Sequence, residues 1–175
     1  NKTVRRLFSQ AELDEARARL GRGYFSDGRD KWALMWAGDA ADRSGKYIPG
    51  GHWTAGLAAW RLGRKSEAAR HFEAAARHSD GADWFHSGAA FWAARAYLVE
   101  RKPEMVIPFL QMASNHQRTF YGLLARRILG IPMEFRWTLP PLDGNSVAEL
   151  AAKPRGERAM ALLQIGEVRR AEREL

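Results

Sequence analysis

The stretch DWFHSGAAFWAARAYLVERKPEMVIPFLQMASNHQRTFYGLLARRILG, residues 83–130, decides the fold, because its apolar residues recur at helical spacing. In its first part, large and small apolar residues recur at steps of three and four, at Trp84, Phe85, Gly88, Ala89, Trp92, Ala93, Ala96 and Tyr97. That spacing places them on one broad face of an amphipathic helix. Pro103 stands where a second helix can begin, since the first turn of a helix leaves its backbone donors unpaired. We therefore predict three consecutive helices joined by short turns.

The order of residues also repeats along the chain. When Gly28, Gly63, Arg101 and Gly166 are aligned, mostly small or apolar residues stand five positions later (Ala33, Ala68, Val106, Ala171) and nine positions later (Ala37, Phe72, Leu110, Leu175). The first two intervals are 35 residues (63 − 28) and 38 residues (101 − 63), close to the roughly 34-residue period of tetratricopeptide repeats. The third interval, 65 residues (166 − 101), exceeds one repeat. The pattern predicts an all-α superhelical solenoid of antiparallel, tetratricopeptide-like helix pairs, whose stacking buries their apolar faces.

The repeat pattern gives a set of helices and three regions. We expect helices at residues 10–25, 30–44, 51–62, 65–78, 83–99, 103–115 and 118–129, with another pair after Arg155. Residues 1–130 would form the helical-repeat region, and residues 131–145, with three prolines, an irregular extended connector. Residues 146–175 would begin a further helical linker region. Because the pattern stops at Leu175 without a helix cap, we expect a truncated segment of a longer protein.

Composition narrows the classes of protein. Hydrophobic residues make up 46% of the chain and charged residues 27%, as in folded rather than disordered chains. There is no uncharged apolar run of about 18 residues, so we expect no transmembrane segment. The absence of cysteine excludes disulfides, thiolate metal sites and thiol catalysis. The net charge of +8 is diffuse, with basic and acidic residues interspersed, which disfavours nucleic acid as a partner.

Two phrases carry a resemblance to a known family. Residues 91–96 read FWAARA, and residues 119–125 read TFYGLLA, with Leu129-Gly130 behind them. Together they resemble the soluble lytic murein transglycosylases, in which such phrases lie in a superhelical region that precedes the catalytic domain. The resemblance implies structural motif positions at Trp92, Arg95, Phe120, Tyr121, Gly122 and Leu124. It also implies that the parent protein acts on peptidoglycan in the bacterial periplasm.

The chemistry of that family is missing from this chain. Lytic transglycosylases cleave glycan with a glutamate in a Glu-Ser motif, followed by a Gly-Leu-Met-Gln segment, and neither occurs here. Since the acid that would protonate a glycosidic oxygen is absent, we expect no catalytic residue. The resemblance implies a non-catalytic scaffold that positions murein glycan strands. A tetratricopeptide-like adaptor that binds a protein or peptide partner stays open as the alternative.

Acidic residues and histidines are further candidates for site residues. We interpret the acidic sets at Glu12, Asp14 and Glu15 and at Asp39 and Asp42 as helix-start or solvent-facing residues beside arginines. His71 and His78 are seven residues apart on one helix, about 10 Å, too far to share an ion. The other three histidines, His52, His86 and His116, look isolated. We therefore expect no metal site and no cofactor.

The seven tryptophans are candidate sugar platforms or candidate core residues. Three pairs have helical spacing, Trp32 with Trp36, Trp53 with Trp60 and Trp84 with Trp92, which favours packing between helices. Any tryptophan left exposed on an inner curve would be a candidate to stack on a sugar. Tyr47 and Trp53 flank the glycine-rich residues 50–51, and they are the candidate glycan contacts.

Overall fold

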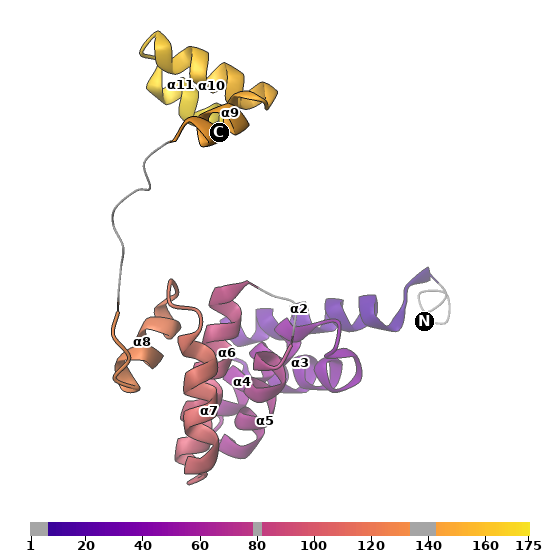
Figure 1. Ribbon diagram of the computed structural model, residues 1–175. Helices are drawn as coiled ribbons and strands as arrows, with labels where there is room; N and C mark the ends of the chain where they lie inside the picture. The colour runs from indigo at the N-terminus through magenta and orange to yellow at the C-terminus, as the bar shows by residue number, and fades with distance from the viewer. Residues whose placement is uncertain (1–6, 79–81, 134–142) are drawn as a thin grey trace. The chain divides into compact units, whose positions relative to one another are not determined.

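The computed structural model describes residues 7–78, 82–133 and 143–175 (Figure 1). The chain divides into two compact units, Asn1–Met133 and Glu134–Leu175, and each is described by itself. Ten α-helices and no β-strand occur within the described ranges, so the predicted all-α class is confirmed.

Seven helices make up the described part of the first unit. They are α2 (Gln10–Ser26), α3 (Asp30–Ser44), α4 (Pro49–Arg61), α5 (Lys65–Ala76), α6 (Asp83–Val99), α7 (Pro103–Ser114) and α8 (Phe120–Ile128). All seven predicted helices occur, with ends that differ by at most two residues. The starts of α4 and α8 each differ by two residues from the prediction, and α4 begins at Pro49 rather than at Gly51. Pro49 occupies the first turn, where its missing N–H costs no hydrogen bond.

The same turn ends α2, α4, α6 and α8 and, in the second unit, α10 (Pro154–Gln164). A residue with positive φ follows each of these helices: Gly28 (75°), Gly63 (77°), Arg101 (58°), Gly130 (69°) and, in the second unit, Gly166 (78°). The next N–H then donates to the carbonyl five residues earlier: Arg29 to Tyr24 at 2.8 Å, Arg64 to Ala59 at 2.9 Å, Lys102 to Tyr97 at 3.0 Å, Ile131 to Arg126 at 2.9 Å and Glu167 to Leu162 at 2.9 Å. This is the Schellman cap, which pairs carbonyls that the helix end leaves open.

The shared cap supports the alignment of the repeat and completes it. Four of its five positions are those aligned by sequence, and the fifth, Gly130, was missed. Gly130 divides the 65-residue interval into 29 residues (130 − 101) and 36 residues (166 − 130). In four pairs of the chain, α2–α3, α4–α5, α6–α7 and α10 with α11 (Val168–Glu174), the linker is three residues long, so the two helices run antiparallel.

Small residues let the helices of the first unit pack closely. Each helix packs on the next, and α2 also packs on α4 and α6 on α8. The aligned residues Ala33 and Ala68 are fully buried, and so are Ala37 and Phe72. Alanine at such positions lets backbones approach, while Phe72 and Phe109 fill the space between pairs. Helix α2 is thus in contact with α4, and α6 with α8. Between α4 and α6 the contact is made by side chains, with the Trp60 and Trp92 rings 5.4 Å apart.

The second unit holds three shorter helices, α9 (Gly144–Ala151), α10 (Pro154–Gln164) and α11 (Val168–Glu174). The pair α10–α11 was predicted, but α9 begins inside the stretch predicted to be an extended connector. Asp143 explains this start, because its carboxylate accepts a hydrogen bond from the Ser146 N–H at 2.8 Å and caps the helix. Most of the predicted connector, residues 134–142, lies outside the described residues.

Candidate functional site

The residues of the family-like phrases meet where α6 contacts α8. The Trp92 indole N–H donates to the Tyr121 hydroxyl over 3.1 Å, and the Tyr121 ring lies 5.3 Å from the Phe91 ring. Gly88 makes room for this contact, since a Cβ there would lie 3.2 Å from the Tyr121 ring. Trp92 and Tyr121 therefore join the two phrases directly, although 29 residues separate them.

The other motif residues have different surroundings. The Arg95 guanidinium lies 4.5 Å from the centre of the Trp92 ring, a cation–π contact on the exposed side of α6. Leu124 packs against the core, whereas the Phe120 side chain is 68% exposed. At Gly122 a Cβ would lie 2.0 Å from the His116 carbonyl oxygen. Glycine is therefore required at this position by the turn that precedes α8. Close packing of another helix is not the reason.

A groove lies between α2, α4 and the start of α6, with a volume of about 390 Å³. We call it the α2–α4 groove. Its lining comes from all three helices: Glu15, Ala18, Arg19, Arg22, Phe25, Ser26, Gly50, Gly51, Trp53, Thr54, Leu57, Trp84 and Phe85. The groove is therefore mixed, with aromatic rings from α4 and α6 and charged groups from α2.

Aromatic rings stack in sequence along one side of the groove. The half-buried Trp53 ring lies 5.6 Å from the buried Phe72 ring and 6.0 Å from the Phe85 ring. Phe85 in turn contacts Trp84 edge to face at 5.9 Å. The Trp84 side chain is 61% exposed, so the prediction that it packs in the core together with Trp92 is wrong. Trp84 stands at the start of α6, beyond the neighbours that cover Trp92.

Charged side chains form the opposite side. Glu15 and Arg19 are paired in one turn of α2, with 2.9 Å between Oε1 and Nε. Arg22, one turn further on, adds a second exposed guanidinium. The groove thus combines an exposed indole with two cations and one carboxylate.

Tyr47 lies in a neighbouring hollow. This second hollow is shared between α2 and the residues before α4, and it has Glu15 and Arg19 in common with the α2–α4 groove. The Tyr47 side chain is 69% exposed, and the Lys46 ammonium lies 5.8 Å from its ring centre. The two candidate glycan contacts, Tyr47 and Trp53, therefore line adjoining hollows. The sequence did not single out Trp84 or the arginines of α2 as site residues, because their grouping depends on how α2 packs against α4.

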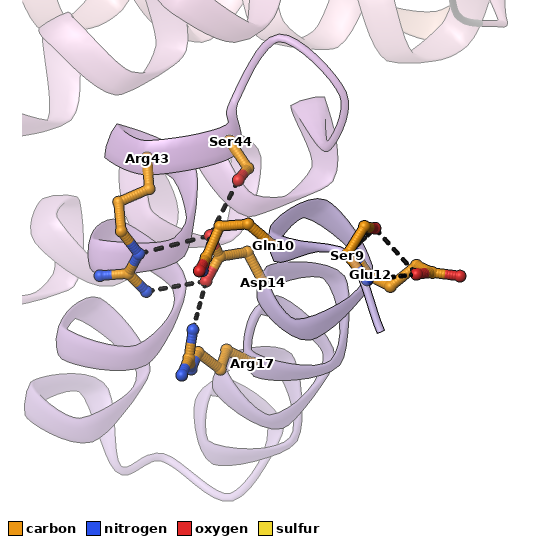
Figure 2. Close-up of polar contacts among 7 residues, drawn as sticks. All are labelled: Ser9, Gln10, Glu12, Asp14, Arg17, Arg43 and Ser44. Carbon is orange, nitrogen blue, oxygen red and sulfur yellow. Dashed lines mark hydrogen bonds and ion pairs between the residues drawn. The ribbon is translucent and has the colours of Figure 1, made fainter. Parts of the chain in front are cut away.

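Among the acidic residues, Asp14 differs most from the prediction. It is fully buried rather than solvent-facing, and its carboxylate accepts hydrogen bonds from four side chains (Figure 2): Gln10 (2.9 Å), Arg17 (2.6 Å), Arg43 (2.8 and 3.3 Å) and Ser44 (2.8 Å). Burial raises the pKa of this carboxyl, but the hydrogen bonds outweigh burial and hold the pKa well below its usual range. Asp14 is thus a charged cross-link between α2 and α3, and all its acceptor positions are used. Glu12, as predicted, lies in the first turn, where it forms a capping box with Ser9.

The interpretation of the histidines as isolated is wrong. The Nδ1 atoms of His52 and His71 lie 2.9 Å apart, and the rings of His86 and His116 stack at 5.8 Å. Burial, followed by the neighbouring Arg70 charge, lowers the pKa of His71 to about 4. Burial also lowers the pKa of His52. Both imidazoles are therefore neutral at neutral pH. The sequence spacing of 19 residues gave no sign of this contact, because it depends on the packing of α4 on α5.

No protein-family model matches the chain, and no curated protein matches it. Among the helices that the structure describes, none has the length and apolar character needed to cross a membrane.

Proposed function

We propose that this chain is a non-catalytic superhelical scaffold from a protein of the lytic transglycosylase type, and that its α2–α4 groove binds glycan strands of peptidoglycan. The proposal rests on one observation above all. An exposed indole, Trp84, faces the same groove as Arg19 and Arg22, in the unit that also carries the family-like phrases.

The superhelical, tetratricopeptide-like arrangement is part of this proposal. It is supported by the recurring Schellman cap and by the contacts of α2 with α4 and of α6 with α8. A stack of such pairs curves, because each pair is rotated slightly against the one before it. In this reading the groove is one section of a longer concave wall.

The groove chemistry suits a peptidoglycan strand. The apolar face of a pyranose ring stacks on an indole, as the exposed Trp84 ring would allow. Stem peptides carry carboxylates, which pair with the guanidinium groups of Arg19 and Arg22. Glu15, the acid that lines the groove, is half-exposed and already paired with Arg19, so we assign it to binding and not to bond cleavage. The scaffold would hold glycan for a catalytic domain outside this chain, in the periplasm.

A sedimentation assay with insoluble peptidoglycan tests the proposal. We expect the chain to co-sediment, and we expect Trp84→Ala and Arg22→Ala to weaken the binding without lowering the melting temperature. Trp32→Ala is the matched control, because Trp32 is also exposed but lies outside the groove. Binding should weaken with salt, since part of it is electrostatic.

The same assay distinguishes the glycan scaffold from the alternative, an adaptor for a protein or peptide. A protein or peptide adaptor would not bind the insoluble peptidoglycan, so the chain would stay in the supernatant. Equal sedimentation of Trp84→Ala, Trp32→Ala and the parent chain would contradict the assignment of the groove. Sedimentation of none of them would contradict the glycan proposal itself.

A further inference from the structure

Three neighbouring helices bring Asp42, His52 and His71 together. Asp42 comes from the end of α3, His52 from the first turn of α4 and His71 from the middle of α5. One carboxylate oxygen and one ring nitrogen from each histidine lie within 4.8 Å of one another. His71 is buried, His52 is half-buried and Asp42 is exposed, so the cluster reaches from the core to the surface.

The hydrogen bonds of the cluster determine which ring nitrogen of each histidine carries a proton. A guanidinium can only donate, so the Arg70 Nη2 group, 3.1 Å from His71 Nε2, donates to that nitrogen. The neutral His71 ring then carries its proton on Nδ1 and donates it to His52 Nδ1, 2.9 Å away. His52 Nδ1 is therefore an acceptor, and its lone pair points toward His71.

We propose that Asp42, His52 and His71 form a binding site for Zn²⁺, with a water molecule as the fourth ligand. Two imidazole nitrogens and one carboxylate oxygen are a ligand set typical of zinc with one open position. Tetrahedral ligands at zinc distances stand about 3.3 Å apart. The two Nδ1 atoms lie 2.9 Å apart and must separate slightly to admit the ion. Binding through His71 Nδ1 also requires the His71 proton to move to Nε2, which becomes possible once the Arg70 donor leaves that nitrogen.

The positive charge of Arg70 lies beside the proposed metal ligands, where the zinc ion would bind. Its guanidinium pairs with Asp42 at 2.8 Å and contacts His71, so it bridges two of the three ligands. Its side chain is 53% exposed, and it is able to swing into water when a metal ion replaces it. The exchange puts one cation in place of another, so Asp42 keeps an opposite charge throughout.

The surroundings of the cluster leave room for the rings and a route for the ion. At Gly45 a Cβ would lie 2.2 Å from His52 Nε2, so only glycine admits the His52 ring at this position. Asp42 and His71 also line a surface hollow of about 300 Å³ between α3 and α5. The hollow is also lined by the carboxylates Asp39 and Glu67 and by the cations Lys31 and Arg64, so with Asp42 its acidic groups outnumber its basic ones.

Calorimetric titration of the metal-free 175-residue chain with zinc chloride at neutral pH tests the proposal. We expect one Zn²⁺ per chain. Removing a direct ligand in His52→Ala should weaken binding by about 100-fold or more, and Asp42→Asn by at least about tenfold. Arg70→Gln should strengthen binding several-fold, because it removes the competing cation. Asp42 and Arg70 are exposed, so their variants are expected to fold even if His52→Ala does not.

His86→Ala is the matched control, since His86 belongs to the other histidine pair. It should leave the affinity unchanged. Substitution of Co²⁺ for Zn²⁺ should give the strong visible absorption of a four-coordinate site. The proposal is overturned if zinc shows no saturable binding, or if Asp42→Asn, Arg70→Gln and the parent chain bind it with equal affinity. Loss of binding in His86→Ala alone would also overturn it, and so would the weak absorption of a six-coordinate cobalt ion.

Discussion

Arg43 on α3 holds the buried Asp14 on α2 through two hydrogen bonds, Nη2 to Oδ1 at 2.8 Å and Nε to Oδ2 at 3.3 Å (Figure 2). This pair is the charged link between the first two helices. Because Asp14 also accepts from Gln10, Arg17 and Ser44, removing its charge leaves several donors without their partner. We expect Asp14→Asn to lower the free energy of unfolding by about 3 kcal/mol. Urea denaturation measures this loss, with Glu15→Gln as the control at a half-exposed carboxylate of the same helix. Equal midpoints for the parent chain and Asp14→Asn would contradict the prediction.

The same carboxylate makes stability depend on acid. The pKa of Asp14 in the folded chain lies below its usual value of 3.8, so in acid the unfolded chain binds the proton more readily. The stabilisation from Asp14 is therefore complete well above pH 3.8 and is lost as the pH falls below it. The gap in unfolding free energy between the parent chain and Asp14→Asn should narrow from about pH 6 to about pH 2, by about 1 kcal/mol or more. A gap that stays constant over this range would contradict the assigned charge state.

Arg101 is the one position of the repeated cap that lacks glycine. Its φ of 58° is strained for a residue with a Cβ, and its side chain is exposed. Arg101→Gly should therefore stabilise the fold by about 1 kcal/mol. Gly63→Ala, at the equivalent position, should destabilise it by a similar amount. Thermal denaturation should give a higher melting temperature than the parent chain for Arg101→Gly and a lower one for Gly63→Ala. A lower melting temperature for Arg101→Gly would contradict this account and show that the arginine side chain itself stabilises the fold.

The contact between Trp92 and Tyr121 is a second test of the fold. Tyr121→Phe removes the acceptor of the indole N–H and keeps the ring, so we expect a loss of about 1 kcal/mol. In the double variant with Trp92→Phe, the second substitution should cost less than it does alone, because the hydrogen bond is already gone. Strict additivity of the two losses in denaturant would contradict the contact.

Gly122 tests the turn before α8. A Cβ at this position would collide with the His116 carbonyl, so Gly122→Ala should cost about 1 to 3 kcal/mol. Gly23→Ala is the matched control, since Gly23 lies in α2 and a Cβ added there would meet no neighbouring side chain or helix within 4 Å. It should stabilise the fold by up to about 1 kcal/mol through helix propensity. The same sign for both alanine variants would contradict this account of Gly122.

The sequence was sufficient for the features that depend on local order. The helix class, the seven helices of the first unit and four of the five cap positions follow from periodicity and from glycine spacing. Gly130 was missed because α8 is short, which shifts its cap out of the expected interval. The start of α9 was missed because Asp143 reads as a turn residue as readily as a helix cap.

The candidate site was less predictable, for a physical reason. Tyr47 and Trp53 were predicted as glycan contacts from their position beside two glycines; the structure places them in hollows beside α2, and their contact with glycan stays a prediction. The exposure of Trp84, the burial of Asp14 and the meeting of His52 with His71 depend on which helix packs against which. Spacing within one helix shows which residues share a face. It does not show which face another helix covers.

Peptidoglycan binding in the α2–α4 groove is the central claim, and an NMR titration with soluble peptidoglycan strands tests it most directly. The indole N–H signals of Trp53 and Trp84 should shift with a common saturation curve, and so should the amides of α2 around Arg19 and Arg22. The indole signal of Trp32, which lies outside the groove, should stay in place. Saturable shifts confined to other helices, or no shift at Trp84, would contradict the account.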